Sequence, residues 1–298
     1  MDKPLGPVRA DVRCVLPDSA FLGEGPHWLT AERKLLWVDI LAPAIHVSDP
    51  ATGKSTSVRM PELVSAVVPR VRGGYVAAMQ TGFKAVDLTT GASTMLASPE
   101  ADRPGNRFND GKCDRRGRFW AGTLAIDATP DAGSLYRFDA DGRVHLMDTG
   151  FHVSNGLGWS PDDRRFYFTD SARRTIYVYD FDLESGAIAD RRVFAEIPEG
   201  HGVPDGMAVD SEGFVWVAQW DGWCVVRHDP DGKVDRVVNL PVPRPTSCAF
   251  GGPDMTTLYV TSARIRLSAA QLADSPLSGS VFAIETGVRG LPETAFAG

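Results

Sequence analysis

Six polar residues occupy the same position of a motif that repeats along this 298-residue chain. Each begins a short segment that is otherwise mostly apolar, and successive members are 41, 44, 46, 50 and 42 residues apart. If the repeats close into a ring, equivalent positions lie on a circle around its axis. The side chains expected to converge there are Glu24, Ser65, Asn109, Asn155, Asp205 and Ser247.

Converging carboxylates repel one another unless a cation offsets them, and this favours a metal site. Glu24, Asn155 and Asp205 offer oxygen ligands. Such ligands suit hard cations such as calcium, magnesium or manganese better than a closed structural zinc site. Three protein ligands leave positions for water or substrate, as a catalytic metal requires.

The same motifs also have a structural explanation. Asn155-Gly156 and Asp205-Gly206 are dipeptides that turns favour, because glycine tolerates a positive φ. The shared register of several repeats is what favours a metal site over simple turns. Arg107 stands two residues before Asn109. Residues i and i+2 of an extended segment share a face, so Arg107 is expected to point toward the same ring.

The elements that must position these residues are short strands. Aromatic or β-branched runs, typical of buried strands, begin at residues 36, 75, 119, 166, 215 and 258. A ring residue precedes each run, and a further strand with an Asp-Gly or Ser-Gly turn signal follows several of them. A unit of about four strands repeated six times predicts an all-β chain, a six-bladed β-propeller with four-stranded blades.

The prediction covers residues 1–298 as a single propeller domain, because no linker or low-complexity segment interrupts the repeats. The strand-like segment 12–16 has no unit before it, and the last unit ends soon after residues 280–284. We therefore expect the N-terminal strand to complete the sixth blade and close the ring. Residues 269–272 predict one helical turn within a loop.

Composition and missing motifs exclude several classes of function. The net charge is −7 with no basic run, which argues against nucleic acid or an anionic membrane surface as a partner. No apolar stretch approaches the roughly 18 residues of a membrane helix, and the N-terminus has no apolar signal-peptide core, so we expect a cytoplasmic location. The four cysteines are widely scattered, which predicts reduced thiols. The chain has no GxSxG, Walker, GxGxxG or HExxH motif.

The ring residues lie within strings that resemble the senescence-marker-protein/gluconolactonase/luciferin-regenerating-enzyme family, the regucalcin-like sugar lactonases. The resemblance runs from about residue 22 to residue 282, and it rests on the order and spacing of the strings together. The strings are LGEGPHW at 22–28, RFNDGK at 107–112, GRFWAGT at 117–123, SNGL at 154–157, PDGM at 204–207 and FGGPD at 250–254. The family is a six-bladed propeller, in agreement with the repeat count.

The resemblance implies a role for each ring residue that matches the family. Glu24, Asn155 and Asp205 match the ligands of one divalent metal ion, and Asp205 also matches the general base. Arg107 and Asn109 match substrate-binding positions. Some members carry a substrate-binding glutamate after the Gly-Thr of the third blade, where this chain has Asp127. Calcium is the first expectation for the ion, with zinc, manganese, magnesium or iron as alternatives.

The function expected from these residues is metal-dependent hydrolysis of a sugar (aldono-) lactone to the sugar acid, as in a gluconolactonase. The partner is then a small-molecule sugar lactone, and the chain is expected to be a monomer or a weak homo-oligomer. Two alternatives stay open. One is an organophosphate or other ester hydrolase on the same propeller, and the other is a non-enzymatic divalent-cation-binding propeller. A propeller that only docks proteins would not need an acidic ring facing its channel.

Overall fold

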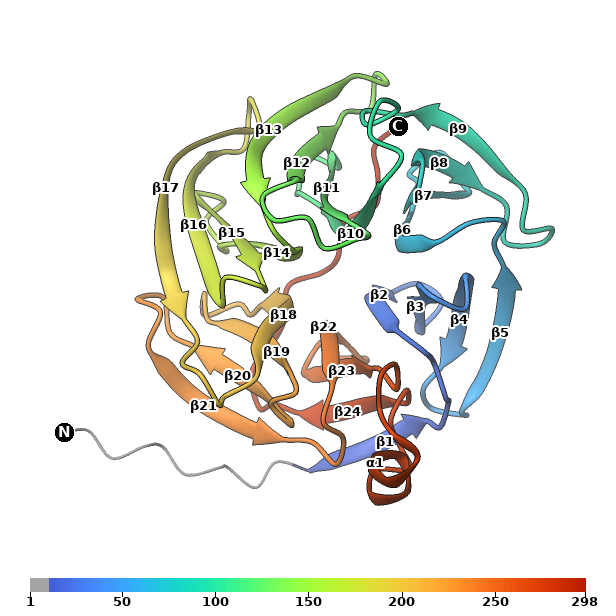
Figure 1. The fold of residues 1–298 in the computed structure, drawn as a ribbon, viewed down its shortest axis with the longest axis vertical. Coiled ribbons are helices and arrows are strands. Elements are labelled where there is room, and N and C mark those ends of the chain that lie inside the picture. The colour runs from blue at the N-terminus through green and yellow to red at the C-terminus, as the bar shows by residue number, and fades with distance from the viewer. Residues whose placement is uncertain (1–10) are drawn as a thin grey trace.

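A computed structural model describes residues 11–298, which form six four-stranded antiparallel sheets arranged around a central axis (Figure 1). Blade 1 contains β2 (Gly23–Leu29), β3 (Lys34–Asp39), β4 (Ala44–Asp49) and β5 (Lys54–Arg59). Blade 2 contains β6 (Val64–Pro69), β7 (Tyr75–Met79), β8 (Gly82–Val86) and β9 (Ser93–Ala97). Blade 3 contains β10 (Asn106–Cys113), β11 (Phe119–Ala125), β12 (Gly133–Phe138) and β13 (Val144–Phe151).

The remaining three blades repeat the same order from the centre outward. Blade 4 contains β14 (Ser154–Trp159), β15 (Arg165–Asp170), β16 (Thr175–Asp182) and β17 (Ala187–Glu196). Blade 5 contains β18 (Val203–Val209), β19 (Val215–Trp220), β20 (Cys224–His228) and β21 (Val234–Asn239). Blade 6 contains β22 (Pro245–Gly251), β23 (Thr257–Ser262) and β24 (Val281–Glu285), with β1 (Val12–Leu16) as its outer strand.

The ring is closed by strands from the two ends of the chain. β1 pairs antiparallel with β24, so that Val12 lies opposite Ile284 and Cys14 opposite Phe282. This confirms the six-bladed propeller and its closure by the N-terminal strand. The predicted helical turn is also present as α1 (Ala269–Asp274), whose capping residue Ser268 accepts a hydrogen bond from the Gln271 backbone N–H. That residues 1–298 form one domain stays a prediction, and residues 1–10 lie outside the described residues.

Burial falls from the centre of each blade to its outer edge. All residues of the inner strands β14 and β22 are buried, whereas the outer strand β5 is almost entirely exposed. An inner strand has neighbouring blades against both faces, so it lacks the alternation of a half-buried strand. Polar residues at the start of an inner strand are therefore buried among apolar ones, and each needs a partner.

Aromatic side chains pack between several pairs of neighbouring blades. Between blades 2 and 3, Phe83 stacks on Phe138 with ring centroids 4.9 Å apart. Phe296, close to the C-terminus, also stacks on Phe138, with ring centroids 5.1 Å apart. The C-terminal strap, which we define as residues 288–298, thus takes part in the packing between blades.

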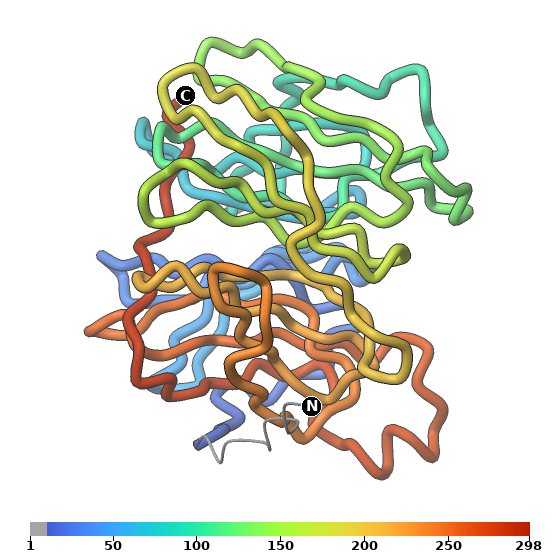
Figure 2. The backbone as a smooth tube through the Cα atoms, turned by 90° about the vertical axis from the view of Figure 1, so that its left-hand side faces the viewer, coloured from blue at the N-terminus to red at the C-terminus, as the bar shows by residue number. Residues whose placement is uncertain are grey.

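The C-terminal strap runs along one flat face of the molecule, as the red segment in Figure 2 shows. Gly290 bridges Asp210 after β18, and Phe296 bridges Arg70 after β6. Both contacts lie where inner strands end, so the strap crosses that end of the central channel. The polar ring residues stand where inner strands begin, which is the opposite end.

All four cysteines are free thiols, three of them buried and Cys14 half-buried. Among residues 11–298 no helix has the length and apolar character needed to cross a membrane.

Candidate metal centre and active site

Every inner strand is irregular at its ring residue. The pairing register of each inner strand with its neighbour shifts beside Glu24, Ser65, Asn109, Asn155, Asp205 and Ser247. Such bulges re-aim a side chain out of the regular pleat. All six ring residues are buried, with exposed fractions of 7% or less. The six positions predicted to form one ring therefore share the same kind of backbone irregularity.

Hydrogen bonds join neighbouring blades at the ring. Ser65 Oγ donates to the Phe108 carbonyl at 2.5 Å, and Asn109 Nδ2 donates to the Ser154 carbonyl at 2.8 Å. The sixth blade meets the first through Thr246 Oγ1, which donates to the Gly23 carbonyl at 2.5 Å. These bonds fix the inner strands relative to one another at the height where the polar side chains converge.

The glycines that follow Asn155 and Asp205 allow neighbouring inner strands to lie close together. A Cβ at Gly156 would lie 2.5 Å from the Asp205 backbone oxygen, and one at Gly206 would lie 2.1 Å from Ser247 Oγ. Both distances are shorter than van der Waals contact, so only glycine lets these inner strands lie so close. The Asn-Gly and Asp-Gly pairs lie within inner strands, which argues against explaining them as turns.

Two buried aspartates hold the chain that leads into the metal-ligand candidates. Asp39, at the end of β3, accepts hydrogen bonds from the backbone N–H groups of Phe21 at 2.8 Å and Leu22 at 3.1 Å. Asp170, at the equivalent end of β15, accepts from those of His152 at 3.0 Å and Val153 at 3.2 Å. Each carboxylate thereby fixes the residues just before Glu24 or Asn155. Sequence reasoning gave them no role, although they recur in register at the end of the strand that follows Glu24 and of the strand that follows Asn155.

The two carboxylates of the predicted ligand set lie close enough to affect each other. Burial raises the pKa of Glu24 well above its usual value, and the charges of Asp205 and Asp110 raise it further. Burial and the charge of Asp110 also raise the pKa of Asp205, while the Asn155 side chain and the Gly206 N–H lower it. Glu24 and Asp205 come from opposite parts of the chain, so the fold brings these two predicted residues together. Burial and neighbouring carboxylates both disfavour the charged forms of Glu24 and Asp205, and a cation bound between them would favour those forms.

Two oxygen atoms of the set have no hydrogen-bond partner among the described residues. They are Oδ1 of Asn155 and Oδ1 of Asp205, both buried. The other end of the Asn155 amide donates from Nδ2 to Ser171 Oγ at 3.1 Å, which leaves Oδ1 as the free end of that side chain. Buried oxygen atoms left without a donor fit a bound cation, and together with the Glu24 carboxylate they form an all-oxygen set suited to a hard ion.

The predicted substrate-binding pair lies beside this set. Arg107 Nη1 donates to Asn109 Oδ1 at 2.8 Å and to the Phe108 carbonyl at 2.8 Å. Burial lowers the pKa of Arg107 to about 10, and the negative charge of Glu24 acts against that shift. The guanidinium therefore stays charged and lies within electrostatic reach of a metal-ligand candidate.

Asp127, the remaining predicted residue, lies elsewhere. It belongs to the exposed loop after β11, and its carboxylate accepts from Thr129 N at 3.0 Å and Thr129 Oγ1 at 2.8 Å. The next residue back, Ile126, is joined to Gly105 by a backbone hydrogen bond, so the loop lies at the end of the channel where β10 begins. The described contacts do not link Asp127 to the metal-ligand candidates, and its substrate role stays a prediction.

Sequence reasoning missed Asp110 and Lys112, which also face the channel. The bulge at Asn109 shifts the alternation of β10, so Asp110 and Lys112 point inward as Arg107 and Asn109 do. Asp110 is buried and accepts from the Gly111 N–H at 2.7 Å. Burial raises its pKa to about 6, against the effect of the Lys112 charge. A strict two-residue alternation places these side chains on the other face, which is why the sequence did not identify them.

Charge in the channel is unbalanced without a cation. The described residues that act on one another there include four carboxyl groups, those of Glu24, Asp110, Asp205 and Glu293, and two cations, Arg107 and Lys112. If all are ionised, two negative charges remain, which one divalent ion would neutralise. Within residues 11–298 no three His, Cys, Asp or Glu side chains gather as a metal cluster. The candidate set differs from such a cluster because it combines two carboxylates with the amide of Asn155.

Comparison with known proteins finds close relatives of this chain. A family model described as SMP-30/Gluconolactonase/LRE-like region matches residues 22–264. A regucalcin from Danio rerio is 40% identical over 291 residues, which cover 96% of this chain and 98% of that protein. A 6-deoxy-6-sulfogluconolactonase from Pseudomonas putida is 41% identical over 288 residues, which cover 96% of this chain and 99% of that protein.

A solved structure gives the same picture of the fold. The crystal structure of a calcium-binding protein, regucalcin, from Agrobacterium tumefaciens matches with a TM-score of 0.92 and 31% identity. The match covers 96% of this chain and 97% of that one. The likeness therefore extends over whole chains rather than over a shared fragment.

Proposed function

The chain belongs to the SMP-30/gluconolactonase/LRE-like family, and on that premise we propose that it hydrolyses a sugar lactone to the corresponding sugar acid with the help of one divalent metal ion. The family membership confirms the resemblance predicted from the strings of residues. Hydrolysis is supported by the lactonase relative, and the metal by the calcium-binding relative and by the ligand set.

The observation that carries the proposal is the pair of unpartnered oxygens, Asn155 Oδ1 and Asp205 Oδ1, buried in the ring that also holds Glu24. These three residues would hold the ion, and calcium is the first choice because its usual ligands are carboxylate and amide oxygens. The bound ion would supply Lewis-acid polarisation of the lactone carbonyl.

The chain's own groups bind the lactone and move the proton. Arg107 and Asn109 donate hydrogen bonds to ring oxygens or hydroxyl groups of the sugar, and Asp127 accepts from a hydroxyl at the rim. Asp205 accepts the proton of the attacking water as general base and returns it to the ring oxygen as the C–O bond of the lactone breaks, which leaves a hydroxyl group and the carboxylic acid. Because the ring is buried, few waters compete for these groups, which strengthens each polar contact with the substrate.

The test is a panel of aldonolactones that includes 6-deoxy-6-sulfogluconolactone, assayed by the acid that ring opening releases. Purified protein is depleted of metal and then supplied with calcium, manganese, magnesium or zinc in turn. We expect turnover of at least one aldonolactone with at least one ion. An organophosphate and a simple aryl ester are run beside the panel. Turnover of these alone would favour the other-esterase alternative, and ion binding without any turnover would favour a cation-binding propeller.

A further inference from the structure

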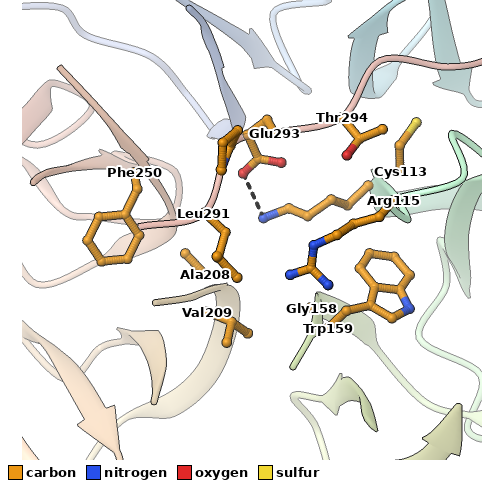
Figure 3. Close-up of a pocket in the computed structure, with 12 residues that line it drawn as sticks. Cys113, Arg115, Gly158, Trp159, Ala208, Val209, Phe250, Leu291, Glu293 and Thr294 are labelled. Atoms are coloured by element: carbon orange, nitrogen blue, oxygen red, sulfur yellow. Dashed lines mark ion pairs between the residues drawn. The ribbon is translucent and has the colours of Figure 1, made fainter. Parts of the chain in front are cut away.

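The channel has a second polar layer below the ring, built around Lys112. Its side chain lines a cavity of about 10 Å³ on the ring side, shared with His27 and Asp110, and a cavity of about 50 Å³ on the side of the strap. The larger cavity is shown in Figure 3, where Glu293 of the strap points into it. Lys112 therefore separates the metal-ligand candidates from the C-terminal strap.

Lys112 is held by groups from three parts of the chain. Its Nζ atom lies 3.3 Å from Glu293 Oε1, the ion pair drawn as a dashed line in Figure 3, and donates to the Met207 carbonyl at 3.1 Å. The two paired side chains are nearly buried, with 17% and 10% of their surface exposed. The negative charge of Asp110 also acts on the ammonium group from the ring side. A nearly buried pair of this kind leaves an uncompensated charge when one partner is removed.

Glu293 is placed by contacts that do not involve its own side chain. Upstream, the Gly290 N–H donates to the Met255 carbonyl at 2.7 Å. Downstream, Phe296 stacks on Phe138, and its N–H donates to the Pro69 carbonyl at 2.8 Å. The strap is thus fixed on both sides of Glu293, and a change of that side chain alone should leave the strap in place.

We propose that Glu293 is a positioning residue for divalent-cation binding at Glu24, Asn155 and Asp205, and that it acts by holding and neutralising the ammonium group of Lys112. The inference rests on the metal site of the proposed function. Asp110 is the link: it lines the smaller cavity together with Lys112 and with Gly25, the residue next to Glu24, and its charge acts on both Glu24 and Asp205. Without Glu293, the full positive charge of Lys112 acts on Asp110 and on a cation beyond it.

The experiment measures the calcium dissociation constant of metal-free protein by titration calorimetry, without any substrate. Glu293→Gln keeps the shape of the side chain and removes its charge. We expect about tenfold weaker calcium binding from one unbalanced charge near a divalent ion in a partly buried channel. The double variant Lys112→Met/Glu293→Gln removes both charges, and we expect its affinity to return to within about threefold of the wild type.

Matched controls come from ion pairs away from the channel. Glu285→Gln breaks the exposed Arg13–Glu285 pair, which has the same 3.3 Å separation, and Lys84→Met breaks the Lys84–Glu62 pair at 3.0 Å. Neither control should change calcium affinity. Equal weakening by the single and the double variant would show that Glu293 acts through packing of the strap, and no weakening in Glu293→Gln would show that its charge does not reach the site. Either result overturns the inference and leaves the metal site standing.

If Glu293→Gln does not fold, Lys112→Met alone carries the test: it removes the positive charge and should bind calcium at least as tightly as the wild type, so weaker binding would overturn the inference. If the wild-type protein itself binds neither calcium nor manganese, the metal part of the proposed function fails together with this inference.

Discussion

Arg107 donates a hydrogen bond from Nη1 to Oδ1 of Asn109 at 2.8 Å, so the two residues predicted to bind the lactone also hold each other. Asn109 is in turn fixed to blade 4 by its bond to the Ser154 carbonyl. The donors are therefore oriented before substrate arrives, which lowers the entropy lost on binding. The arrangement also leaves Nε and Nη2 of Arg107 without a hydrogen bond to the described residues, available to a ligand.

Replacing Arg107 should affect substrate more than metal. We expect Arg107→Ala to lower kcat/KM by about 10- to 100-fold, the loss of one or two charge-assisted hydrogen bonds, with metal content near that of the wild type. Steady-state kinetics and metal analysis of the purified variant measure both. Arg165→Ala, which removes a surface hydrogen bond to the Pro230 carbonyl, is the control. Loss of metal from Arg107→Ala would show that the guanidinium organises the ligands instead.

Removing the metal should lower both activity and stability. Without a cation, the carboxyl groups of Glu24 and Asp205 are buried beside each other and beside Asp110. We expect chelator-treated protein to lose lactonase activity and to melt at a lower temperature. Restoring an ion to 100 times its dissociation constant should return about 2.7 kcal/mol of stability. Full turnover after verified metal removal would rule out the mechanism proposed above.

The stability of metal-free protein should depend on pH through Asp110. Its pKa is about 6 in the fold, above the ordinary value of 3.8. The folded state thus binds this proton more tightly, so the stabilising contribution is complete below pH 3.8 and is lost as pH rises through 6. Asp110→Asn cannot lose a proton, and we expect it to become more stable than the wild type between pH 4 and pH 6.

The advantage of Asp110→Asn should level off above about pH 7 at no more than about 3 kcal/mol, which corresponds to roughly two pKa units. Urea unfolding across pH, with chelator present, measures it. Asp87→Asn is the control, because the Thr89 N–H and neighbouring hydroxyls lower the pKa of that exposed carboxylate. It should show no gain in stability at high pH, and an Asp110→Asn profile parallel to the wild type would contradict the prediction.

The sequence predicts the parts of the site that repeat and not the parts that depart from the repeat. Glu24, Asn155 and Asp205 could be found because each blade offers the same position once. Asp110 and Lys112 could not, because the bulge at Asn109 reverses the alternation by which inward residues are counted. Glu293 belongs to no repeat, and only the folded strap brings it to Lys112.

The fold itself was predictable because the repeat in the sequence is also the repeat in the structure: each sequence unit forms one four-stranded blade. An aromatic or β-branched run lies in the second strand of every blade, from β3 to β23. The segment at residues 12–16 belongs to no repeat unit in the sequence, and it forms β1. Loops carry no such signal. The position of Asp127 could be assigned only by the resemblance, and the structure shows its carboxylate capping Thr129 at the rim.

Asp127 gives a test that separates a substrate contact from a loop contact. If it binds a sugar hydroxyl, Asp127→Ala should raise KM by about 3- to 30-fold, the loss of one or two hydrogen bonds, with calcium affinity unchanged. Thr129→Val removes the hydroxyl that bonds to the same carboxylate while keeping its charge, and it should leave KM near the wild-type value. Equal effects in both variants would assign Asp127 to the loop and remove it from the substrate site.

Asp205 is proposed to act both as metal ligand and as general base, and Asp205→Asn separates the two roles. The amide keeps an oxygen that can coordinate, but it cannot accept a proton at neutral pH. A general base contributes about 10²–10⁴-fold in rate, so at saturating metal we expect kcat to fall at least a hundredfold, with the fold intact and metal binding weakened but measurable.

Asp221→Asn is the matched control: it changes another Asp-Gly pair, at a positive φ that asparagine also accepts, and turnover should stay near normal. The substitution leaves Gly206 unchanged, so the glycine that allows the close approach of β18 to Ser247 is kept in the variant. A variant that recovers most of its rate when metal is saturating would remove Asp205 as the base and assign it to the ligand set alone.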